Sequence, residues 1–164
     1  EYWEAVGIKT IVKSEERSVH YQRMLSNELQ ISVWGQDGAL YPIWLDYAYW
    51  YVPWIQSSSR IGPEFGLWRD TKGKAGKEPT GDIAKALELF DKAVAEVDEQ
   101  KRIEYATQVL DLVSENLWTI GTVLLAESPM VVKNKFRNVP EVAITDWQLR
   151  TPKNTHPEQY FWKK

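Results

Sequence analysis

Large aromatic side chains are crowded into the middle of the chain, among residues that interrupt regular structure. Ten aromatic residues lie between residues 33 and 68, together with carboxylates, hydroxyls, glycines and prolines. A ring can stack its apolar face on a ligand while a neighbouring polar group orients that ligand. This aromatic tract, residues 33–68, is therefore predicted to line a ligand-binding cleft rather than to form one regular helix or strand.

Two tryptophans of the tract, Trp34 and Trp50, are the first choices for rings that face a ligand. Burying a large ring is worth about 2–3 kcal/mol, so most indole rings in proteins belong to the core. The core is accordingly the expected place for Trp44, Trp54 and Trp68. The tryptophans outside the tract are expected to pack against other side chains; they include Trp118, Trp147 and Trp162.

Carboxylates in and beside the tract allow a second interpretation, as a carbohydrate-active hydrolase. Such enzymes use two carboxyl groups roughly 5–10 Å apart, one of them with a raised pKa. The candidates for this pair are Asp37, Asp46, Glu64 and Asp70. Nothing in their spacing fixes such a separation, and the chain contains no cysteine and no recognisable Ser–His pair for nucleophilic catalysis. The hydrolase therefore stands as the alternative to a binding protein without catalytic residues.

The remaining polar groups point to no cofactor and no metal. His20 and His156 have no partner at metal-ligand spacing and are expected to be structural or exposed. Residues 57–60, Ser-Ser-Ser-Arg, offer hydroxyls and a guanidinium to a carboxylate or a sugar, although a solvated turn is favoured. A net charge of −3 argues against a nucleic-acid partner, which requires a concentrated positive surface.

The elements that must position these groups follow from hydropathy periodicity and capping residues. Strands are expected at residues 6–13, 30–34, 118–126 and 130–133. Helices are expected at residues 14–28, capped by Ser14, and at residues 82–97 and 98–116, the last capped by Asp98. The first strand, helix and second strand form a βαβ unit in this scheme, and residues 71–81 form a flexible loop.

The two long helices each carry an apolar stripe, which predicts that they cover a sheet or pack on each other. The stripe of the first helix comprises Ile83, Leu87, Phe90, Val94 and Val97. The stripe of the second helix comprises Ile103, Ala106, Leu110, Val113 and Leu117. A helical interaction module built on these faces is a third interpretation, but it leaves the aromatic tract without a function.

In this order, the elements resemble the C-terminal part of peptide-type extracellular solute-binding proteins. That family delivers dipeptides, oligopeptides, nickel chelates or oligosaccharides to ABC importers. The matching segments are residues 3–9, 31–38, 98–102, 120–126, 129–139, 146–152 and 157–162. Each segment is weakly specific alone, whereas their order and spacing together are specific.

The resemblance implies an α/β fold: one lobe of a type II periplasmic-binding-protein-like fold, with a mixed sheet covered by helices. Residues 1–164 then form a C-terminal lobe fragment, with a lobe core at residues 1–138 and a crossing tail at residues 139–164. Glu1 opens a segment that reads as a helix end turning into a strand, so the chain is expected to begin inside a longer protein. It should hold half of an interlobe binding site.

By the same resemblance, the loop after Trp34 faces the cleft, and Asp37 meets the amino group of the ligand. Trp34 then forms a wall, and Gln36 is a hydrogen-bonding neighbour. The implied partners are a small-molecule ligand, the missing N-terminal lobe and an ABC transporter permease. The implied location is periplasmic or extracellular, and lipid anchoring through a missing N-terminus is left open.

The class of ligand stays open between a peptide, an oligosaccharide and a metal chelate. A carboxylate such as Asp37 suits the α-amine of a peptide, whereas the wealth of tryptophan suits the flat faces of a sugar. A peptide is slightly favoured because the family as a whole favours it.

Overall fold

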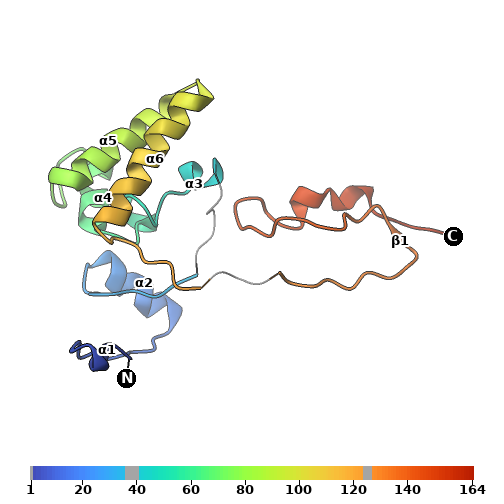
Figure 1. The fold of residues 1–164 in the computed structure, drawn as a ribbon, viewed down its shortest axis with the longest axis horizontal. Coiled ribbons are helices and arrows are strands. Elements are labelled where there is room, and N and C mark those ends of the chain that lie inside the picture. Colours follow the sequence, from blue (N-terminus) through green and yellow to red (C-terminus); the bar gives the residue numbers. More distant parts are fainter. Residues whose placement is uncertain (1, 36–40, 124–126) are drawn as a thin grey trace.

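The computed structural model describes residues 2–35, 41–123 and 127–164. Figure 1 shows a helical body, an N-terminal segment beside it, and an arm that projects away from both and is formed by residues 127–164. The α-helices are α1 Tyr2–Ala5, α2 Arg17–Leu25, α3 Ile43–Asp46, α4 Pro63–Asp70, α5 Gly81–Ala95 and α6 Glu99–Glu115. No helix in these described ranges is long and apolar enough to cross a bilayer.

The core lies where α5 and α6 pack side by side as an antiparallel pair against the aromatic tract (Figure 1). Both helices were expected, and their ends agree with the prediction within two residues. The buried residues of this core are Trp44, Leu45, Ala48, Val52, Ala86, Leu87, Leu89, Phe90, Ala93, Ala106, Val109, Leu112 and Val113. Segments distant in sequence therefore share one core, centred on α5 and α6.

The predicted apolar stripes are only partly correct. Leu87, Phe90, Ala106 and Val113 are buried as expected. The other stripe residues that are exposed include two within the helices, Val94 at 57% and Leu110 at 37%, and two beyond the helix ends, Val97 at 91% and Leu117 at 68%. Within α5, Ala86 and Ala93 are fully buried, and their small side chains allow the facing side chains to approach closely.

Side-chain caps begin two of the helices. The Asp98 carboxylate accepts a hydrogen bond of 2.9 Å from the backbone N–H of Lys101, which confirms Asp98 as the cap of α6. The cap of α2 is Glu16 rather than Ser14, because the Glu16 carboxylate accepts from the backbone N–H of Ser18 at 2.8 Å. The predicted cap was therefore wrong by two residues, and the helix ends at Leu25 rather than near residue 28.

We expect Asp98→Ala to lower the free energy of unfolding by about 1 kcal/mol, because it leaves a backbone N–H of the first turn of α6 without its acceptor. Urea unfolding of the full-length protein that carries this sequence measures the change. Asp111→Ala, on the exposed face of the same helix, is the matched control and should change stability by less than about 0.5 kcal/mol. Equal effects of the two substitutions would contradict the capping role.

The expected mixed sheet is not formed in the described part of the chain. Its only sheet there joins two short antiparallel strands, β1 Phe136–Arg137 and β2 Phe161–Trp162, with Phe136 opposite Trp162. The predicted strands at residues 6–13, 30–34, 118–126 and 130–133 are wrong wherever the structure describes them. A strand requires a backbone ladder with a neighbour, and no described segment supplies one. Without that ladder the βαβ unit is absent as well.

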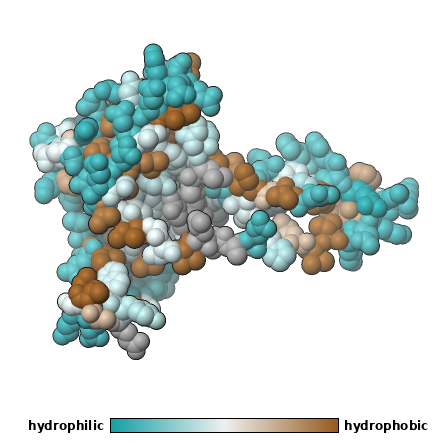
Figure 2. Space-filling model, in the orientation of Figure 1, coloured by the Kyte–Doolittle hydropathy of each residue, from teal (hydrophilic) through white to brown (hydrophobic). Residues whose placement is uncertain are grey.

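The unformed strands leave apolar side chains on the surface. Ile11 is 76% exposed, Val33 is 85% exposed and Val131 is fully exposed. Figure 2 shows apolar patches over the arm and over the N-terminal segment. These segments alternate in hydropathy, but their apolar side chains do not form a buried face.

Residues 71–77 fold back on α4 instead of forming the open loop expected from composition. The Thr71 hydroxyl donates to the Leu67 carbonyl at 2.8 Å and accepts from the Ala75 N–H at 3.0 Å. The Lys77 N–H donates to the Glu64 carbonyl at 3.0 Å, at the other end of α4. These bonds hold the turn against the helix and account for its glycines, which permit the close approach.

Candidate functional site

Much of the aromatic tract forms core rather than the lining of a cleft. Trp44 and Tyr49 are each 2% exposed, and Trp50 is 7% exposed. Trp44 belongs to the core formed with α5 and α6, and Tyr41, Tyr51 and Trp54 pack against that core, whereas Tyr49 and Trp50 are buried outside it. The expectation for Trp44 is confirmed, whereas the broader prediction that the tract lines a cleft is wrong for these buried rings. Ring burial against α5 and α6 is what the tract chiefly supplies.

Trp34 lies outside that core, half-buried against α2. Its ring stacks on His20 with a centroid distance of 5.5 Å and an interplanar angle of 16°. Tyr21 meets it edge-on, also at 5.5 Å, and the Arg17 guanidinium lies 5.5 Å from its ring centre. His20 is thus structural, as expected, and its Nε2 lies 3.0 Å from the Ser32 hydroxyl. These contacts fix the indole at the surface of the N-terminal segment.

Arg60 is the side chain that links Trp34 to the buried rings of the tract, Tyr49 and Trp50. Its guanidinium carbon lies near four ring centres, at 4.7 Å from Tyr21, 5.0 Å from Tyr49, 5.7 Å from Trp34 and 6.0 Å from Trp50. A guanidinium is attracted to ring faces at such distances, and stacking is a preferred geometry for arginine. We call this group the Arg60 cluster. It brings together two residues nominated from the sequence, Trp34 and Trp50.

Hydrogen bonds fix the position of Arg60 within its cluster. Its backbone N–H donates to the Tyr49 carbonyl at 2.8 Å. Its Nη2 donates to the Tyr21 hydroxyl at 2.5 Å, and its Nη1 donates to the Met24 sulfur at 3.1 Å. Two of these partners belong to α2 and one belongs to the tract, so Arg60 connects the N-terminal segment to the helical body.

The predicted ligand-binding residues fall into two groups. Trp34 and Trp50 meet at Arg60, and the Trp50 indole Nε1 is buried without a hydrogen-bond partner among the described residues. Gln36 and Asp37 lie outside the described residues. The structure therefore positions the aromatic half of the candidate site.

Arg60 itself was assigned to a solvated turn from the sequence, and that interpretation was wrong. Ser59 is fully buried and its hydroxyl donates to the Ile55 carbonyl at 2.5 Å, while Arg60 is half-buried among rings. The serines and glycine suggested a turn, and the turn exists. The overlooked signal was an arginine at the end of a ring-rich tract, where its side chain finds faces to stack on.

Of the carboxylates proposed for a hydrolase, Asp46, Glu64 and Asp70 lie on two helices of the described part of the chain. Glu64 and Asp70 lie six residues apart on α4, which places them on different faces of that helix. Asp70 accepts from the backbone N–H of Gln56 at 2.9 Å, and Asp46 is exposed on α3. Asp37 lies outside the described residues. The described carboxylates therefore give no support to the hydrolase.

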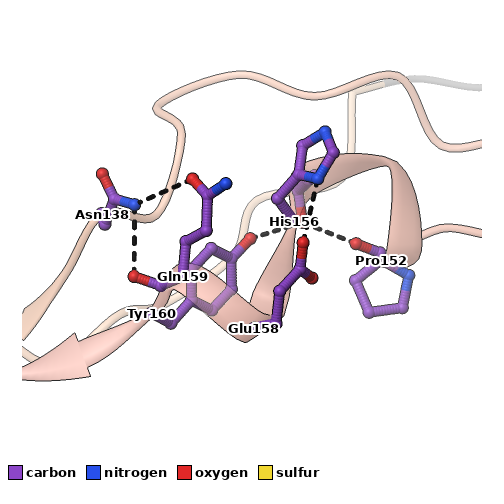
Figure 3. Close-up of polar contacts among 7 residues, drawn as sticks. Asn138, Pro152, His156, Glu158, Gln159 and Tyr160 are labelled. Carbon is purple, nitrogen blue, oxygen red and sulfur yellow. Dashed lines mark hydrogen bonds and ion pairs between the residues drawn. The ribbon is translucent and has the colours of Figure 1, made fainter.

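The arm contains a separate, open hollow of about 500 Å³. Figure 3 shows its polar contacts: the amide of Asn138 donates to the Gln159 carbonyl at 3.2 Å, and His156 Nδ1 lies 3.0 Å from Glu158 Oε1. A hydrogen bond from its own backbone N–H, then one from His156, holds the pKa of Glu158 below its usual value. Contrary to expectation, Trp147 and Trp162 of the arm are 65% and 59% exposed.

Comparison with known proteins found a similarity to a solved structure. No family model and no curated protein matches the chain. A solved structure described as oligopeptide-binding protein OppA is 30% identical to it, with a TM-score of 0.69, over 99% of this chain and 28% of that one. The chain thus spans less than a third of the length of this neighbour. The chain has an α/β fold that corresponds to part of a type II periplasmic-binding-protein-like fold, and it resembles part of an oligopeptide-binding protein.

Proposed function

We propose that the chain is the C-terminal part of a peptide-type solute-binding protein, which captures an oligopeptide between two lobes and presents it to the permease of an ABC importer. The observation that carries this proposal is the similarity to an oligopeptide-binding protein over 99% of the chain. Residues 1–138 belong to one lobe, and residues 139–164 form the tail that crosses to the N-terminal lobe. The protein acts in the periplasm or outside the cell.

The projecting arm supports this assignment of the tail. It carries exposed rings, Trp147 at 65% and Phe161 at 55%, and it extends away from the helical body (Figure 1). Large exposed apolar surface of this kind marks an interaction site. The N-terminal lobe is the proposed partner of this surface, since the chain spans 28% of its solved neighbour.

The proposed ligand-binding residues are Trp34, Gln36 and Asp37, and Trp50 acts on the site only through Arg60. The Asp37 carboxylate pairs with the α-ammonium of the peptide, and Gln36 hydrogen-bonds beside it. Trp34 forms a wall for the ligand. The role of Trp50 is to hold the Arg60 cluster from the core side, given that its ring is buried and lies 6.0 Å from the guanidinium.

Transport follows from these contacts without a chemical step. A peptide that touches both lobes binds the closed form more tightly than the open form, so it shifts the protein toward closure. The permease then recognises the closed form. One lobe alone makes only part of the contacts with the ligand. Closure therefore depends on a ligand that contacts both lobes.

Binding by the full-length protein that carries this sequence tests the proposal. We expect isothermal titration calorimetry to detect di- to pentapeptides and to detect no malto- or cello-oligosaccharide. Asp37→Asn should weaken peptides with a free amino group about 10- to 100-fold, because a charge-assisted bond is lost, and should leave N-acetylated peptides unchanged.

Asp46→Asn is the matched control, since Asp46 is an exposed carboxylate of the same tract, and it should not change affinity. Oligosaccharide binding without peptide binding would contradict the peptide assignment. Release of a reducing sugar from an oligosaccharide would instead support the hydrolase.

A further inference from the structure

The ring of Trp34 depends on helix α2 for its position. We infer that His20 is a positioning residue of the ligand-binding site, which holds the Trp34 indole in the orientation in which that ring forms a wall for the bound peptide. This inference rests on the proposed function. It concerns a side chain of α2 that is not itself among the residues proposed to contact the ligand.

The backbone that carries Trp34 has little support of its own. Residues 32–35 form neither helix nor strand, and in the described part of the chain no backbone–backbone hydrogen bond involves residues 29–35. The side chain of Val33 is 85% exposed, so it does not hold the segment in place by packing. Segments with few buried contacts and no backbone ladder open most easily. The orientation of the indole is therefore set by side-chain contacts.

His20 supplies two of these contacts at once. Its ring stacks on the Trp34 ring, with centroids 5.5 Å apart and an interplanar angle of 16°, and its Nε2 atom lies 3.0 Å from the Ser32 hydroxyl. A hydroxyl both donates and accepts, so the bond to Ser32 forms with either neutral tautomer of His20. The stack fixes the plane of the indole, and the hydrogen bond fixes the segment that carries it.

Helix α2 in turn holds His20. The backbone N–H of His20 donates to the Glu16 carbonyl at 3.0 Å, at the start of the helix. Met24, one turn further along, is buried, and its sulfur accepts a hydrogen bond of 3.1 Å from Arg60 of the tract. The helix is thus attached to the helical body, beside which it lies in Figure 1, and His20 extends that attachment to Trp34.

Two other side chains of α2 approach the indole, but neither holds it in the same way. The Arg17 guanidinium lies 5.5 Å from the ring centre and belongs to an exposed residue, where the attraction of a cation to a ring is weak. Tyr21 meets the ring edge-on, and its hydroxyl accepts a hydrogen bond from Arg60. Of these three residues, only His20 stacks nearly parallel to the indole and also bonds to the segment that carries it.

The orientation of the indole affects affinity because an unfixed side chain must be ordered when the ligand binds. For one side chain, that ordering corresponds to roughly a 2- to 10-fold loss of affinity. With His20 in place, the indole is ordered before the ligand arrives. His20 is not part of the core formed with α5 and α6, so its replacement should weaken binding without unfolding the helical body.

Binding of tri-alanine by the full-length protein, measured by calorimetry, tests the inference. His20→Ala should weaken binding about 3- to 10-fold, because it removes both the stack and the hydrogen bond. His20→Phe keeps a flat ring for the stack and should recover most of that loss. His156→Ala is the matched control: this imidazole belongs to the arm and is 69% exposed, so its removal should leave the affinity unchanged.

A double-mutant cycle separates a positioning role from a structural one. If His20 acts through Trp34, His20→Ala should cause no further loss of affinity in a protein that already carries Trp34→Ala. Fluorine NMR of protein labelled with 5-fluorotryptophan adds a direct readout, with the Trp34 line assigned by its absence in Trp34→Ala. That line should move toward the frequency of solvent-exposed tryptophan in His20→Ala, because the ring current of the imidazole is lost, while the other tryptophan lines stay in place.

Ser32→Ala keeps the test open if His20→Ala does not fold, because it removes only the hydrogen bond and leaves the imidazole in place. It should weaken tri-alanine binding about 2- to 3-fold when Trp34 is present and should have no effect in Trp34→Ala.

Three results would overturn the inference and leave the proposed function standing. The first is wild-type affinity in His20→Ala. The second is an equal loss of affinity from His20→Ala with and without Trp34, since that pattern marks a structural role. The third is wild-type affinity in Trp34→Ala, since His20 would then have no ligand wall to position. Failure of tri-alanine to bind the wild type would instead count against the peptide-binding function, on which the inference rests.

Discussion

Replacing Trp44 by alanine is expected to lower the free energy of unfolding by about 3–5 kcal/mol. Trp44 is 2% exposed and belongs to the core formed with α5 and α6. Its ring meets Tyr51 edge-on at a centroid distance of 5.1 Å, so truncation also removes an aromatic contact. Helix α3, which carries Trp44, has four residues and also buries Leu45. It is not expected to move into the cavity left by the Trp44 ring without losing that packing.

Urea unfolding of the full-length protein measures this loss, and Trp147→Ala is its matched control. The chemical change is identical, but Trp147 is 65% exposed in the arm. The control should cost less than about 1 kcal/mol if the arm is solvated as the structure shows. A larger loss for Trp147 than for Trp44 would show that the arm, and not the helical body, carries the main hydrophobic core of the full-length protein.

The two long helices, α5 and α6, were predictable because their signals are local, whereas α3 and α4, inside the aromatic tract, were not predicted. Apolar periodicity lies within the segments that became α5 and α6, and at α6 the Asp98 cap coincides with it. At residues 14–16 the local signals competed, because serine and glutamate are both able to cap, and Glu16 is the cap. A cap is decided by which oxygen reaches the second or third N–H, and composition alone does not settle that.

Strands were not predictable, because pairing is not a local property. Residues 6–13 alternate in hydropathy, yet a strand exists only where a second segment offers backbone groups in register. The strands that form, β1 and β2, are two residues each and pair positions 24 and 26 residues apart in a region with little periodicity. Chain topology decided the sheet, and hydropathy did not.

Trp34 and Trp50 were named from the sequence and lie beside the same guanidinium, whereas that guanidinium, Arg60, was not named as part of the site. Trp34 and Trp50 were nominated because large rings among chain-breaking residues indicate a ligand surface. Their meeting point, Arg60, lies 10 residues beyond Trp50 in a serine-rich turn whose sequence indicates exposure. Only the fold brings Tyr21 of α2 and Tyr49 of the tract onto the same guanidinium.

A methyl group on Gly76 should be among the most damaging small changes in this chain. Gly76 has a φ of +84°, which L-residues rarely adopt, and a Cβ there would lie 2.5 Å from the backbone nitrogen of Trp68. It would also overlap the Glu64 carbonyl, which accepts the 3.0 Å bond from the Lys77 N–H. Gly76→Ala is therefore expected to cost about 3 kcal/mol, from backbone strain and overpacking together.

Gly7→Ala separates these two causes, because Gly7 has the same φ of +84° but no atom within 4 Å of the added Cβ. Its loss should be about 1 kcal/mol, from backbone strain alone. Urea unfolding of the full-length protein measures both variants, and hydrogen exchange of the Lys77 amide reports the turn directly. The packing of residues 71–77 on α4 predicts that Gly76→Ala loses more stability than Gly7→Ala and exposes the Lys77 amide to exchange. Equal losses in the two variants, with the Lys77 amide still protected in Gly76→Ala, would contradict that packing.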